Sequence, residues 1–484
     1  TEAIANRYHR EFQNNFKQLG FTYDFYTRTD EGHHHQSVQN IFKLLLDNGY
    51  LYKKAIEQTY CEYDNQFLPD RFVEGICPIC GAKARGDQCD HCSSILDPLD
   101  LIDKRCKICG HEPVIKETEH FYFEFSHFQQ ALENFIQQAE NDHRWRDNAI
   151  QLTKRYLAEG VPDRAVTRDL PNGISVPIEG FEDKKIYVWI EAVSGYLTAS
   201  IEWAKQHNEN IEDWWNDHTT SYYIHGKDNI PFHTIIWPSI LMAIGNQALP
   251  THIISNEYLT LEKRKLSTSQ NWAVWIPYIT RKYDPDSIRY FLTINAPENR
   301  DTDFSWREFI LSHNGELLGA YGNFVNRTFK FIEKSFEGKI PVGMINKDIQ
   351  NETFQLYSSV GRLIEDGHFK QALEEIFKYI RHANKYFDIQ QPWIQVKQNK
   401  NEGENTLYTC TYIILNLAQL LHPFLPFSTD KIKEMFRIKK VEWQEQTDIP
   451  RQVYDVRPLF ERIDTNLIEQ EYNHLMDCSP NYSS

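Results

Sequence analysis

This 484-residue sequence has no apolar run long enough to cross a membrane, and it is poor in positive charge. Hydrophobic residues make up 41% and charged residues 25% of the chain, but no stretch approaches the roughly 20 apolar residues that a membrane span needs. The formal net charge of −16 argues against attraction to nucleic acid over the whole surface, because that attraction arises when Lys and Arg neutralise phosphates. A local basic groove is still compatible with this composition.

Repeats, low-complexity segments and a secretory leader are also absent from the sequence. The chain begins at Thr1 without Met or a basic and apolar leader, which we interpret as a cut or processed start of a protein that is not secreted. Its length predicts several domains, because single hydrophobic cores stop growing near roughly 250 to 300 residues. We expect a cytoplasmic protein with no membrane partner, and we interpret the single chain as a monomer.

Cysteine is scarce outside one segment, because seven of the nine cysteines lie between Cys61 and Cys109. This clustering, in a chain without an export signal, favours metal binding over disulfides. Two Cys-x2-Cys pairs predict a structural zinc site, whose four ligands would be Cys77, Cys80, Cys89 and Cys92. Four thiolates leave no open coordination position, so we expect this zinc to stabilise the fold rather than to take part in chemistry.

A third Cys-x2-Cys pair leaves the number of zinc ions open. Cys106 and Cys109 would need two further ligands, and the nearby candidates are Cys61 and Asp64. The alternatives are therefore one zinc ion or two. Reduced cysteines that are buried singly, without any metal, are a further alternative.

The order of the predicted elements indicates an α/β fold followed by helices. Residues 1–60 have helical spacing of apolar residues without an obvious opening strand, and residues 61–117 form a small insertion rich in Gly, Pro and Cys. In residues 118–300, strand-like runs alternate with helices, which predicts a doubly wound parallel sheet. These runs are HFYFEF, IYVWIEA, SYYIHG and THIISNEYLT. Residues 301–484 are predicted to be an all-α bundle whose polar tail, after Tyr472, is frayed.

Aromatic residues follow two of the predicted strands and are expected to line one slot at the carboxyl edge of the sheet. Trp189, Ala192 and Tyr196 lie in the segment IYVWIEAVSGY, where they are expected to follow the end of its strand. His233 and Trp237 lie four residues apart, and therefore on one face of the helix after the second run. Aromatic walls suit a thioether, whose sulfur gains roughly 0.3 to 1.5 kcal/mol against a ring. Ordinary core packing would explain the same aromatic residues without a ligand.

The segment Lys265 to Ser269 (KLSTS) is predicted to be an exposed loop at the same edge of the sheet. Phosphoryl and nucleotidyl transfer depend largely on positioning and charge stabilisation, which a cationic loop rich in hydroxyl groups supplies. By itself, the loop is also consistent with an ordinary surface turn.

Taken together, these segments resemble the methionyl-tRNA synthetases, which are class I aminoacyl-tRNA synthetases. The segments that look like family segments, in family order, are FLPDRFVEGICPIC, ARGDQCDHC, KETEHFYF, VWIEAVSGYL, GKDNIPFH, STSQNWAVW, DPDSIRYFL, GNFVNRTFKFI and QPW. The resemblance covers essentially the whole chain. It implies a Rossmann-like core, a zinc-knuckle connective insertion and a helical anticodon-binding domain, with residues 1–60 as the remainder of the N-terminal catalytic half.

The resemblance also implies site residues. The positions that match the methionine pocket are Trp189, Ala192, Tyr196, Asn229, His233 and Trp237. The positions that match the ATP site are Arg168, Gly226, Lys227, Asp228, Lys265, Ser267, Thr268 and Ser269. The positions that match residues reading the CAU anticodon are Asn323, Arg327 and Trp393. KLSTS resembles the family's KMSKS loop, with Thr268 in place of the second lysine, so we expect charge stabilisation from Lys265 and neighbours such as Arg264.

One departure from the family pattern concerns its HIGH motif, which contacts ATP. His33, His34 and His35 follow no predicted strand and are interpreted as solvated loop residues. Either a segment that this chain omits carries the motif, or the protein is a fragment or a degenerate relative that does not activate an amino acid. We favour omission, because the other motifs look intact.

The function implied by the resemblance is that of a methionine–tRNA ligase. Methionine and ATP would give methionyl adenylate, and tRNA(Met) would then take the methionyl group; Mg²⁺ bound to ATP and structural zinc are the implied metals. One alternative is another class I synthetase, although those for branched amino acids carry a large editing insertion rather than a short cysteine-rich one. The second alternative is a noncatalytic, synthetase-like protein that binds tRNA or has a regulatory role.

Overall fold

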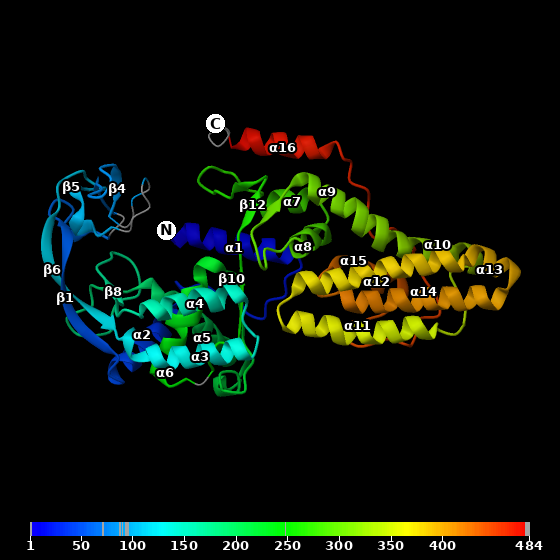
Figure 1. Cartoon of the computed structure of the whole chain (residues 1–484), viewed down its shortest axis with the longest axis horizontal. Coiled ribbons are helices and arrows are strands. Elements are labelled where there is room, and N and C mark those ends of the chain that lie inside the picture. Colours follow the sequence, from blue (N-terminus) through cyan, green and yellow to red (C-terminus); the bar gives the residue numbers. More distant parts are fainter. Residues whose placement is uncertain are drawn as a thin grey trace. The chain divides into compact units, whose positions relative to one another are not determined.

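The computed structural model describes residues 2–69, 72–86, 89, 91, 96–246 and 248–479 (Figure 1). The chain forms two compact units, one of residues Asp24–Ser255 and one of Thr1–Tyr23 with Asn256–Ser484, and each is described by itself. Within the described residues, no helix combines the length and the apolar character that crossing a membrane requires.

A long antiparallel ribbon dominates one side of the unit Asp24–Ser255 (Figure 1). Its strands are β1 (Leu51–Cys61) and β6 (Val114–Phe123), paired from Leu51 opposite Phe123 to Tyr60 opposite Val114. Short strands β2 (Gln66–Phe67) and β7 (Arg164–Ala165) extend the sheet in the order β2-β1-β6-β7. Residues 1–60 were predicted to be mostly helical without an opening strand, and they contain helices up to Asp47, but from Leu51 onward the chain forms β1 and pairs with β6.

The cysteine-rich insertion is carried by the far end of this ribbon. Its sheet has the order β4-β3-β5, made of β3 (Val73–Ile76), β4 (Lys83–Arg85) and β5 (Ile102–Cys106), with a 3-10 turn η2 (Pro98–Asp100) before the last strand. Buried apolar side chains around it are few, and half of them are cysteines. This small core is the kind that needs further support to fold.

Helices surround a short sheet in the rest of this unit. The helices are α2 (Gly32–Asp47), α3 (Gln129–Asn141), α4 (Asp147–Glu159), α5 (Val188–His207) and α6 (Trp237–Ile244), with a 3-10 turn η3 (Phe125–Phe128) before α3 and a further one, η4 (Ile211–Asp213), after α5. β10 (Tyr222–Gly226) lies beside β11 (His252–Asn256), and Trp145 forms a parallel bridge to Ile253. β8 (Thr167–Arg168) pairs antiparallel with β9 (Lys185–Ile186).

Two local predictions were wrong in this unit. The run IYVWIEA is a strand only as far as Ile186, because Ile190, Val193 and Leu197 bury one face of α5. The three histidines after Gly32 lie in α2 rather than in a solvated loop. His34 is buried, and its Nδ1 lies 2.7 Å from Thr198 Oγ1 on α5, since α2 packs against that helix.

The second unit combines a small sheet with helices. Its sheet has the order β13-β12-β14, from β12 (Leu259–Leu261), β13 (Arg264–Lys265) and β14 (Thr302–Phe304). β12 runs antiparallel to β13 and parallel to β14. The helices near this sheet are α1 (Glu2–Gln18), α7 (Ile276–Lys282), α8 (Pro285–Ile294), α9 (Trp306–Ser312) and α16 (Leu467–Cys478).

The predicted bundle forms the rest of the second unit and is confirmed. A π-helical segment η7 (His313–Gly322) leads into α10 (Asn323–Phe336), α11 (Lys347–Glu365), α12 (Phe369–Gln390), α13 (Pro392–Gln398), α14 (Lys400–Leu421) and α15 (Pro426–Phe436). The long helices α10, α11, α12 and α14 lie along one another (Figure 1). α14 is buried on all sides from Thr409 to Leu421, as expected of a central helix. The tail is not frayed as far as Cys478, because α16 buries Glu471 and Leu475.

Candidate active site

A hydrogen-bonded pair of rings forms the centre of the predicted methionine pocket. Tyr196 on α5 and His233 lie with the phenol oxygen 2.7 Å from Nε2. His233 Nδ1 lies 2.8 Å from the carbonyl oxygen of Asn229, so it must carry the proton and donate. Nε2 therefore accepts from the Tyr196 hydroxyl. Burial, reinforced by the neighbouring His225, lowers the pKa of His233 to about 4, so the imidazole is neutral at ordinary pH.

The backbone around His233 explains how its ring reaches Tyr196. β10 ends at Gly226, a 3-10 turn η5 covers Lys227–Asn229, and a π-helical turn η6 covers Phe232–Ile236 before α6 begins. A π-helical turn is wider than an α-helical one and is frequently found at functional sites. The strand-to-helix turn that the sequence predicts at Gly226, Lys227 and Asp228 is present.

Trp237 forms the floor of this group. It is fully buried, and its indole nitrogen donates to the hydroxyl of Tyr223 at 3.0 Å. Tyr223 in turn lies edge-on to Tyr196, with ring centroids 4.8 Å apart, and burial raises its pKa to about 12. We call Tyr196, Tyr223, His225, His233 and Trp237 the aromatic cluster. Tyr223 and His225 were missed from the sequence, although both lie in the run SYYIHG.

The remaining predicted pocket residues lie around this cluster in different ways. Trp189 packs edge-on against Phe232, with centroids 5.9 Å apart, and the guanidinium of Arg164 lies 4.7 Å from its ring centroid. Together with Phe232 and Asp228, Trp189 lines a largely apolar cavity of about 330 Å³. Ala192 and Asn229 are exposed, and the carbonyl of Asn229 holds the His233 ring.

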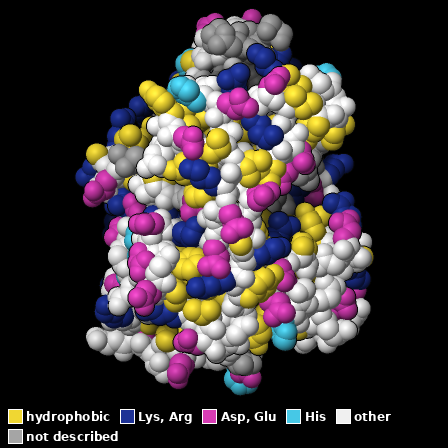
Figure 2. Space-filling view, turned by 90° about the vertical axis from the view of Figure 1, so that its left-hand side faces the viewer, with side chains coloured by type: hydrophobic (Ala, Val, Ile, Leu, Met, Phe, Trp, Pro, Cys, Tyr) yellow, Lys and Arg dark blue, Asp and Glu magenta, His cyan; other side chains and the backbone are white. Residues whose placement is uncertain are grey.

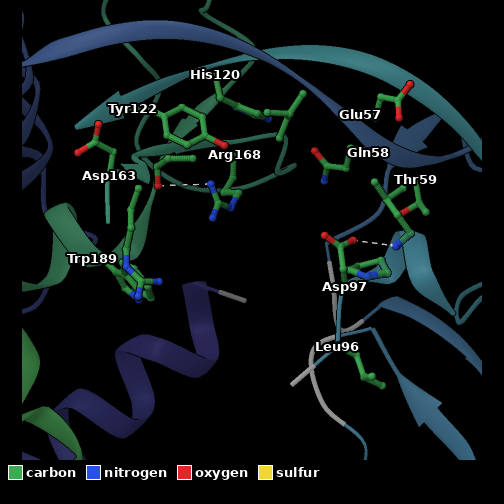
Figure 3. A pocket seen from close by; sticks show the side chains of 15 residues that line it. Glu57, Gln58, Thr59, Leu96, Asp97, His120, Tyr122, Asp163, Arg168 and Trp189 are labelled. Atoms are coloured by element: carbon green, nitrogen blue, oxygen red, sulfur yellow. Dashed lines mark hydrogen bonds between the residues drawn. The ribbon is translucent and has the colours of Figure 1, made fainter. Parts of the chain in front are cut away.

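A second, more polar cavity of about 320 Å³ lies under the ribbon and also contacts Trp189 (Figure 3). His120 and Tyr122 from β6 and Arg168 from β8 line it. The guanidinium of Arg168 donates to the carbonyl of Thr167 at 3.0 Å and lies 4.3 Å from the ring centroid of Tyr187. Arg168 is therefore one of the residues that line this cavity.

A buried charge cluster fixes the loop that carries Arg168. Asp169 Oδ1 accepts from Lys184 Nζ at 2.7 Å, and its Oδ2 lies 2.9 Å from Thr118 Oγ1 and 3.1 Å from His120 Nε2. Burial opposes ionisation of Asp169, but the hydrogen bonds from His120 and Lys184 prevail and lower its pKa to about 2. The sequence offered one weak signal for this cluster, a histidine inside the apolar strand HFYF.

The KLSTS segment forms a tight, exposed turn in the second unit. An exposed loop was predicted, but the segment continues from β13 of the sheet β13-β12-β14 rather than from the β10-β11 sheet, whose strand β10 leads into the pocket residues. Ser267 and Trp272 exchange both backbone hydrogen bonds, at 3.0 and 2.9 Å, and Lys265 pairs with Thr260 in the sheet. Lys265, Thr268 and Ser269 are exposed, and the hydroxyls of Ser267 and Ser269 lie 3.2 Å apart. One cation and the hydroxyl groups of Thr268 and Ser269 are therefore exposed within five residues, while Ser267 is half-buried. Arg264 packs its guanidinium 5.1 Å from the Trp272 ring centroid.

The three predicted anticodon residues lie together at one end of the bundle. Arg327 on α10 forms an ion pair with Asp388 at 2.6 Å, and its guanidinium lies 4.6 Å from the Phe387 ring centroid and 6.0 Å from that of Trp393. Asn323, one helical turn earlier, is half-buried. Trp393 exposes 37% of its surface, which leaves part of its ring available for stacking.

The cysteines fall into two clusters in the insertion. Potential ligand atoms of Cys77, Cys80 and Cys89 lie within 4.8 Å of one another, and the fourth predicted ligand, Cys92, lies outside the described residues. In the second cluster, Cys61 Sγ is 3.4 Å from Cys109 Sγ, and Asp64 Oδ2 is 3.2 Å from Cys61 Sγ and 3.1 Å from Cys106 Sγ. Soft sulfur donors at these spacings fit Zn²⁺.

Charges of both signs intermingle on the face shown in Figure 2, where Lys and Arg side chains alternate with Asp and Glu. This agrees with the negative net charge of the chain. Among the described residues, this face as a whole therefore offers no surface of a single sign to a polyanion.

Comparison with known proteins assigns the class. Residues 1–329 match the family model described as tRNA synthetases class I (M), and residues 346–474 match the anticodon-binding domain of tRNA ligases. The chain belongs to this class I tRNA synthetase family.

Individual relatives are named for one amino acid, methionine. The chain is 59% identical to a protein named methionine–tRNA ligase from Bacillus cereus (strain B4264), over 98% of this chain and 87% of the relative. It is also 59% identical to one from Streptococcus pneumoniae (strain CGSP14), over 99% of this chain and 88% of the relative.

Solved structures agree in fold. Methionyl-tRNA synthetase of Mycobacterium tuberculosis in complex with methionyl-adenylate matches with a TM-score of 0.77 and 21% identity, over 95% of this chain and 87% of that one. The free form of the same enzyme matches with a TM-score of 0.74. The predicted α/β fold with a Rossmann-like core followed by a helical bundle is confirmed.

Proposed function

We propose that this chain is a methionine–tRNA ligase. It activates methionine with ATP, giving methionyl adenylate and pyrophosphate, and then transfers the methionyl group to the 3′ end of tRNA(Met). The observation that carries this conclusion is the 59% identity to curated methionine–tRNA ligases over nearly the whole chain, across both matched domains. The cytoplasm is the proposed site of action.

The aromatic cluster suits the side chain of methionine. A neutral His233, fixed by Asn229 and Tyr196 and stacked on His225, places an aromatic ring in the cluster without a charge to desolvate. Sulfur against an aromatic ring gains roughly 0.3 to 1.5 kcal/mol. Trp237 is fully buried beneath the cluster and is hydrogen-bonded to Tyr223. In this proposal, Trp189, Ala192 and Asn229 complete the pocket.

Activation of methionine requires its carboxylate to attack the α-phosphate of ATP while pyrophosphate leaves. No covalent enzyme intermediate is needed, so the protein contributes orientation and charge stabilisation. We assign the stabilising cations to Lys265, Arg168 and Lys227. The hydroxyls of Ser267, Thr268 and Ser269 donate hydrogen bonds to phosphate oxygens, and Gly226 and Asp228 border the nucleotide. Mg²⁺ that accompanies ATP neutralises part of the phosphate charge.

Recognition of tRNA is assigned to the end of the bundle that carries Arg327 and Trp393. Unstacked anticodon bases bind proteins by stacking on aromatic rings and by hydrogen bonds to guanidinium and amide groups. Arg327, Trp393 and Asn323 provide one group of each kind within a small area.

Structural zinc is proposed for the cysteine-rich insertion. Cys77, Cys80 and Cys89, together with Cys92, would bind one ion. Cys61, Asp64, Cys106 and Cys109 would bind a second, through three sulfurs and one carboxylate oxygen. Bound metal would supply the stability that the sparse core of the insertion lacks.

The decisive experiment is exchange of labelled pyrophosphate into ATP by the intact protein. We expect exchange that depends on methionine and is not supported by isoleucine, valine, leucine or cysteine, followed by charging of tRNA(Met). Exchange with one of the other amino acids would indicate a different class I synthetase. Absence of all exchange, with tRNA binding retained, would support a noncatalytic binding protein.

A further inference from the structure

The C-terminal helix α16 ends against the base of the KLSTS turn. Three groups of Asn271, the residue that closes the turn, are hydrogen-bonded: its carbonyl oxygen accepts from Ser479 Oγ at 2.6 Å, and its side-chain nitrogen donates to the carbonyl of Cys478 at 3.0 Å. Its side-chain oxygen accepts from the indole nitrogen of Trp275 at 2.8 Å. Two of these three bonds come from residues more than 200 positions away in the sequence.

The backbone of Asn271 makes these bonds important for the shape of the turn. Asn271 has φ = 54°, in the left-handed region that non-glycine residues adopt at a cost. Asparagine tolerates this region better than most residues, and the bonds to α16 and Trp275 hold it there. The next residue, Trp272, is buried and donates its indole N–H to the carbonyl of Leu261 at 3.0 Å. The base of the turn is thus fixed, while Thr268, Ser269 and Gln270 at its tip are exposed.

The helix that provides these bonds is itself firmly anchored. Glu471, which is 1% exposed, accepts hydrogen bonds from Tyr278 at 2.5 Å, Lys282 at 2.9 Å and Tyr283 at 2.8 Å. The rings of Tyr278 and His474 are stacked with centroids 4.7 Å apart. A helix held by a buried carboxylate with three donors presents Ser479 at a fixed position.

We propose that Asn271 and Ser479 are positioning residues for adenylate formation. They hold the KLSTS turn so that Lys265 and the turn's hydroxyl groups meet the ATP phosphates in one orientation, and α16 therefore controls activation without touching the substrate. The inference rests on the proposed function, and it adds the C-terminal helix to the machinery that positions ATP.

Two substitutions test this arrangement in the intact protein. Ser479→Ala removes the hydroxyl that holds the Asn271 carbonyl, and Asn271→Asp keeps the acceptor for Trp275 but loses the donor to Cys478. In methionine-dependent pyrophosphate exchange, each is expected to raise the KM for ATP or lower kcat by about three- to tenfold, the effect of losing one hydrogen bond. The KM for methionine should change by less than about twofold. Ser479→Thr, which keeps the hydroxyl, should restore wild-type kinetics.

Asn466→Ala is the matched control, because Asn466 flanks the opposite end of α16 and hydrogen-bonds to Asp464 rather than to the turn. Wild-type ATP kinetics in both Ser479→Ala and Asn271→Asp would overturn the proposal. So would an equal rise of both KM values accompanied by a lower Tm, since that pattern indicates a purely structural role.

Amide hydrogen exchange separates failure of this inference from failure of the proposed function. Residues 264–272 should exchange faster in Ser479→Ala and Asn271→Asp than in the wild type and in Asn466→Ala, whether or not the protein is active. Unchanged exchange rates in both variants would overturn the inference. A wild-type protein without pyrophosphate exchange would instead refute the methionine–tRNA ligase assignment.

Discussion

The aromatic cluster and the KLSTS turn hold their functional groups in opposite ways. In the cluster, the side chains of Tyr196 and His233 are hydrogen-bonded to each other, and Trp237 is fully buried beneath them. In the turn, Lys265, Thr268 and Ser269 are exposed, and the hydrogen bonds to residues outside the turn concentrate at Asn271 and Trp272 at its base.

This difference follows from what each region has to recognise. An apolar side chain is bound by removing its surface from water, which requires walls that are already dry and ordered. Phosphate charge develops and moves during nucleotidyl transfer. The groups that stabilise it must therefore be accessible to the ligand and be carried by a backbone that is held in place. Substitutions in the cluster should therefore change methionine binding and stability, whereas substitutions in the turn should change the chemical step.

The largest expected effect comes from Lys265→Gln. Loss of a cation that stabilises transition-state charge should lower kcat in pyrophosphate exchange by about 10²- to 10³-fold, with little change in the KM for methionine. Lys263→Gln is the control, since Lys263 is an exposed cation two residues earlier, in the turn between β12 and β13. A kcat within about threefold of wild type in Lys265→Gln would remove the contrast between the two regions.

The pH dependence of stability tests whether the cluster is preorganised around a neutral His233. The folded pKa of about 4 lies below the ordinary value of 6.5, so the unfolded chain binds more protons between these values. The contribution of His233 is complete above pH 6.5 and is lost as the pH falls through 4. At about 1.4 kcal/mol per pKa unit, it reaches about 3 kcal/mol.

Urea unfolding from pH 4 to 7 measures this contribution. The rise of the unfolding free energy with pH should be smaller in His233→Gln than in the wild type. His218→Gln is the control, because the side chain of His218 is 92% exposed. Equal slopes in the wild type and in His233→Gln would show that His233 titrates normally.

His233→Ala should weaken methionine binding more than it slows the reaction. It removes a ring wall and leaves the Tyr196 hydroxyl without its partner, a loss of about 2 kcal/mol or roughly 30-fold in the KM for methionine. The KM for ATP and the zinc content, measured by atomic absorption, should stay at wild-type values. Loss of zinc and solubility together would mean that His233 is only a core residue.

The sequence could predict the turn more fully than the cluster, because the turn is local. Lys265 to Ser269 are contiguous, and their charge and hydroxyl groups indicate exposure without knowledge of the fold. Tyr196 and His233 are 37 residues apart, so their hydrogen bond depends on how α5 packs against the π-helical turn. The aromatic residues at these positions suggested a pocket. The tautomer of His233 and the contacts of Tyr223 could be established only from the structure.

The wrong predictions also have physical reasons. Val188 and Trp189 favour strands by propensity, yet α5 forms because its apolar residues recur every three or four positions and pack as a helix. His34 was interpreted as solvated because it is polar, whereas for Glu471 the sequence makes no prediction of burial. Both are buried because partners distant in the sequence satisfy them: Thr198 for His34, and two tyrosines and a lysine for Glu471.

The smallest expected effect, and the sharpest test of preorganisation, is that of Tyr196→Phe. The substitution keeps the ring that lies edge-on to Tyr223 and removes only the hydroxyl that donates to His233 Nε2. One lost hydrogen bond corresponds to about 1 kcal/mol, or roughly fivefold in the KM for methionine. In the double variant Tyr196→Phe with His233→Ala, the loss of methionine-binding free energy should be smaller than the sum of the losses in the two single variants, because both remove the same hydrogen bond. Strict additivity in this double-mutant cycle, measured by pyrophosphate exchange, would show that the two rings act separately and that the cluster does not bind methionine as a unit.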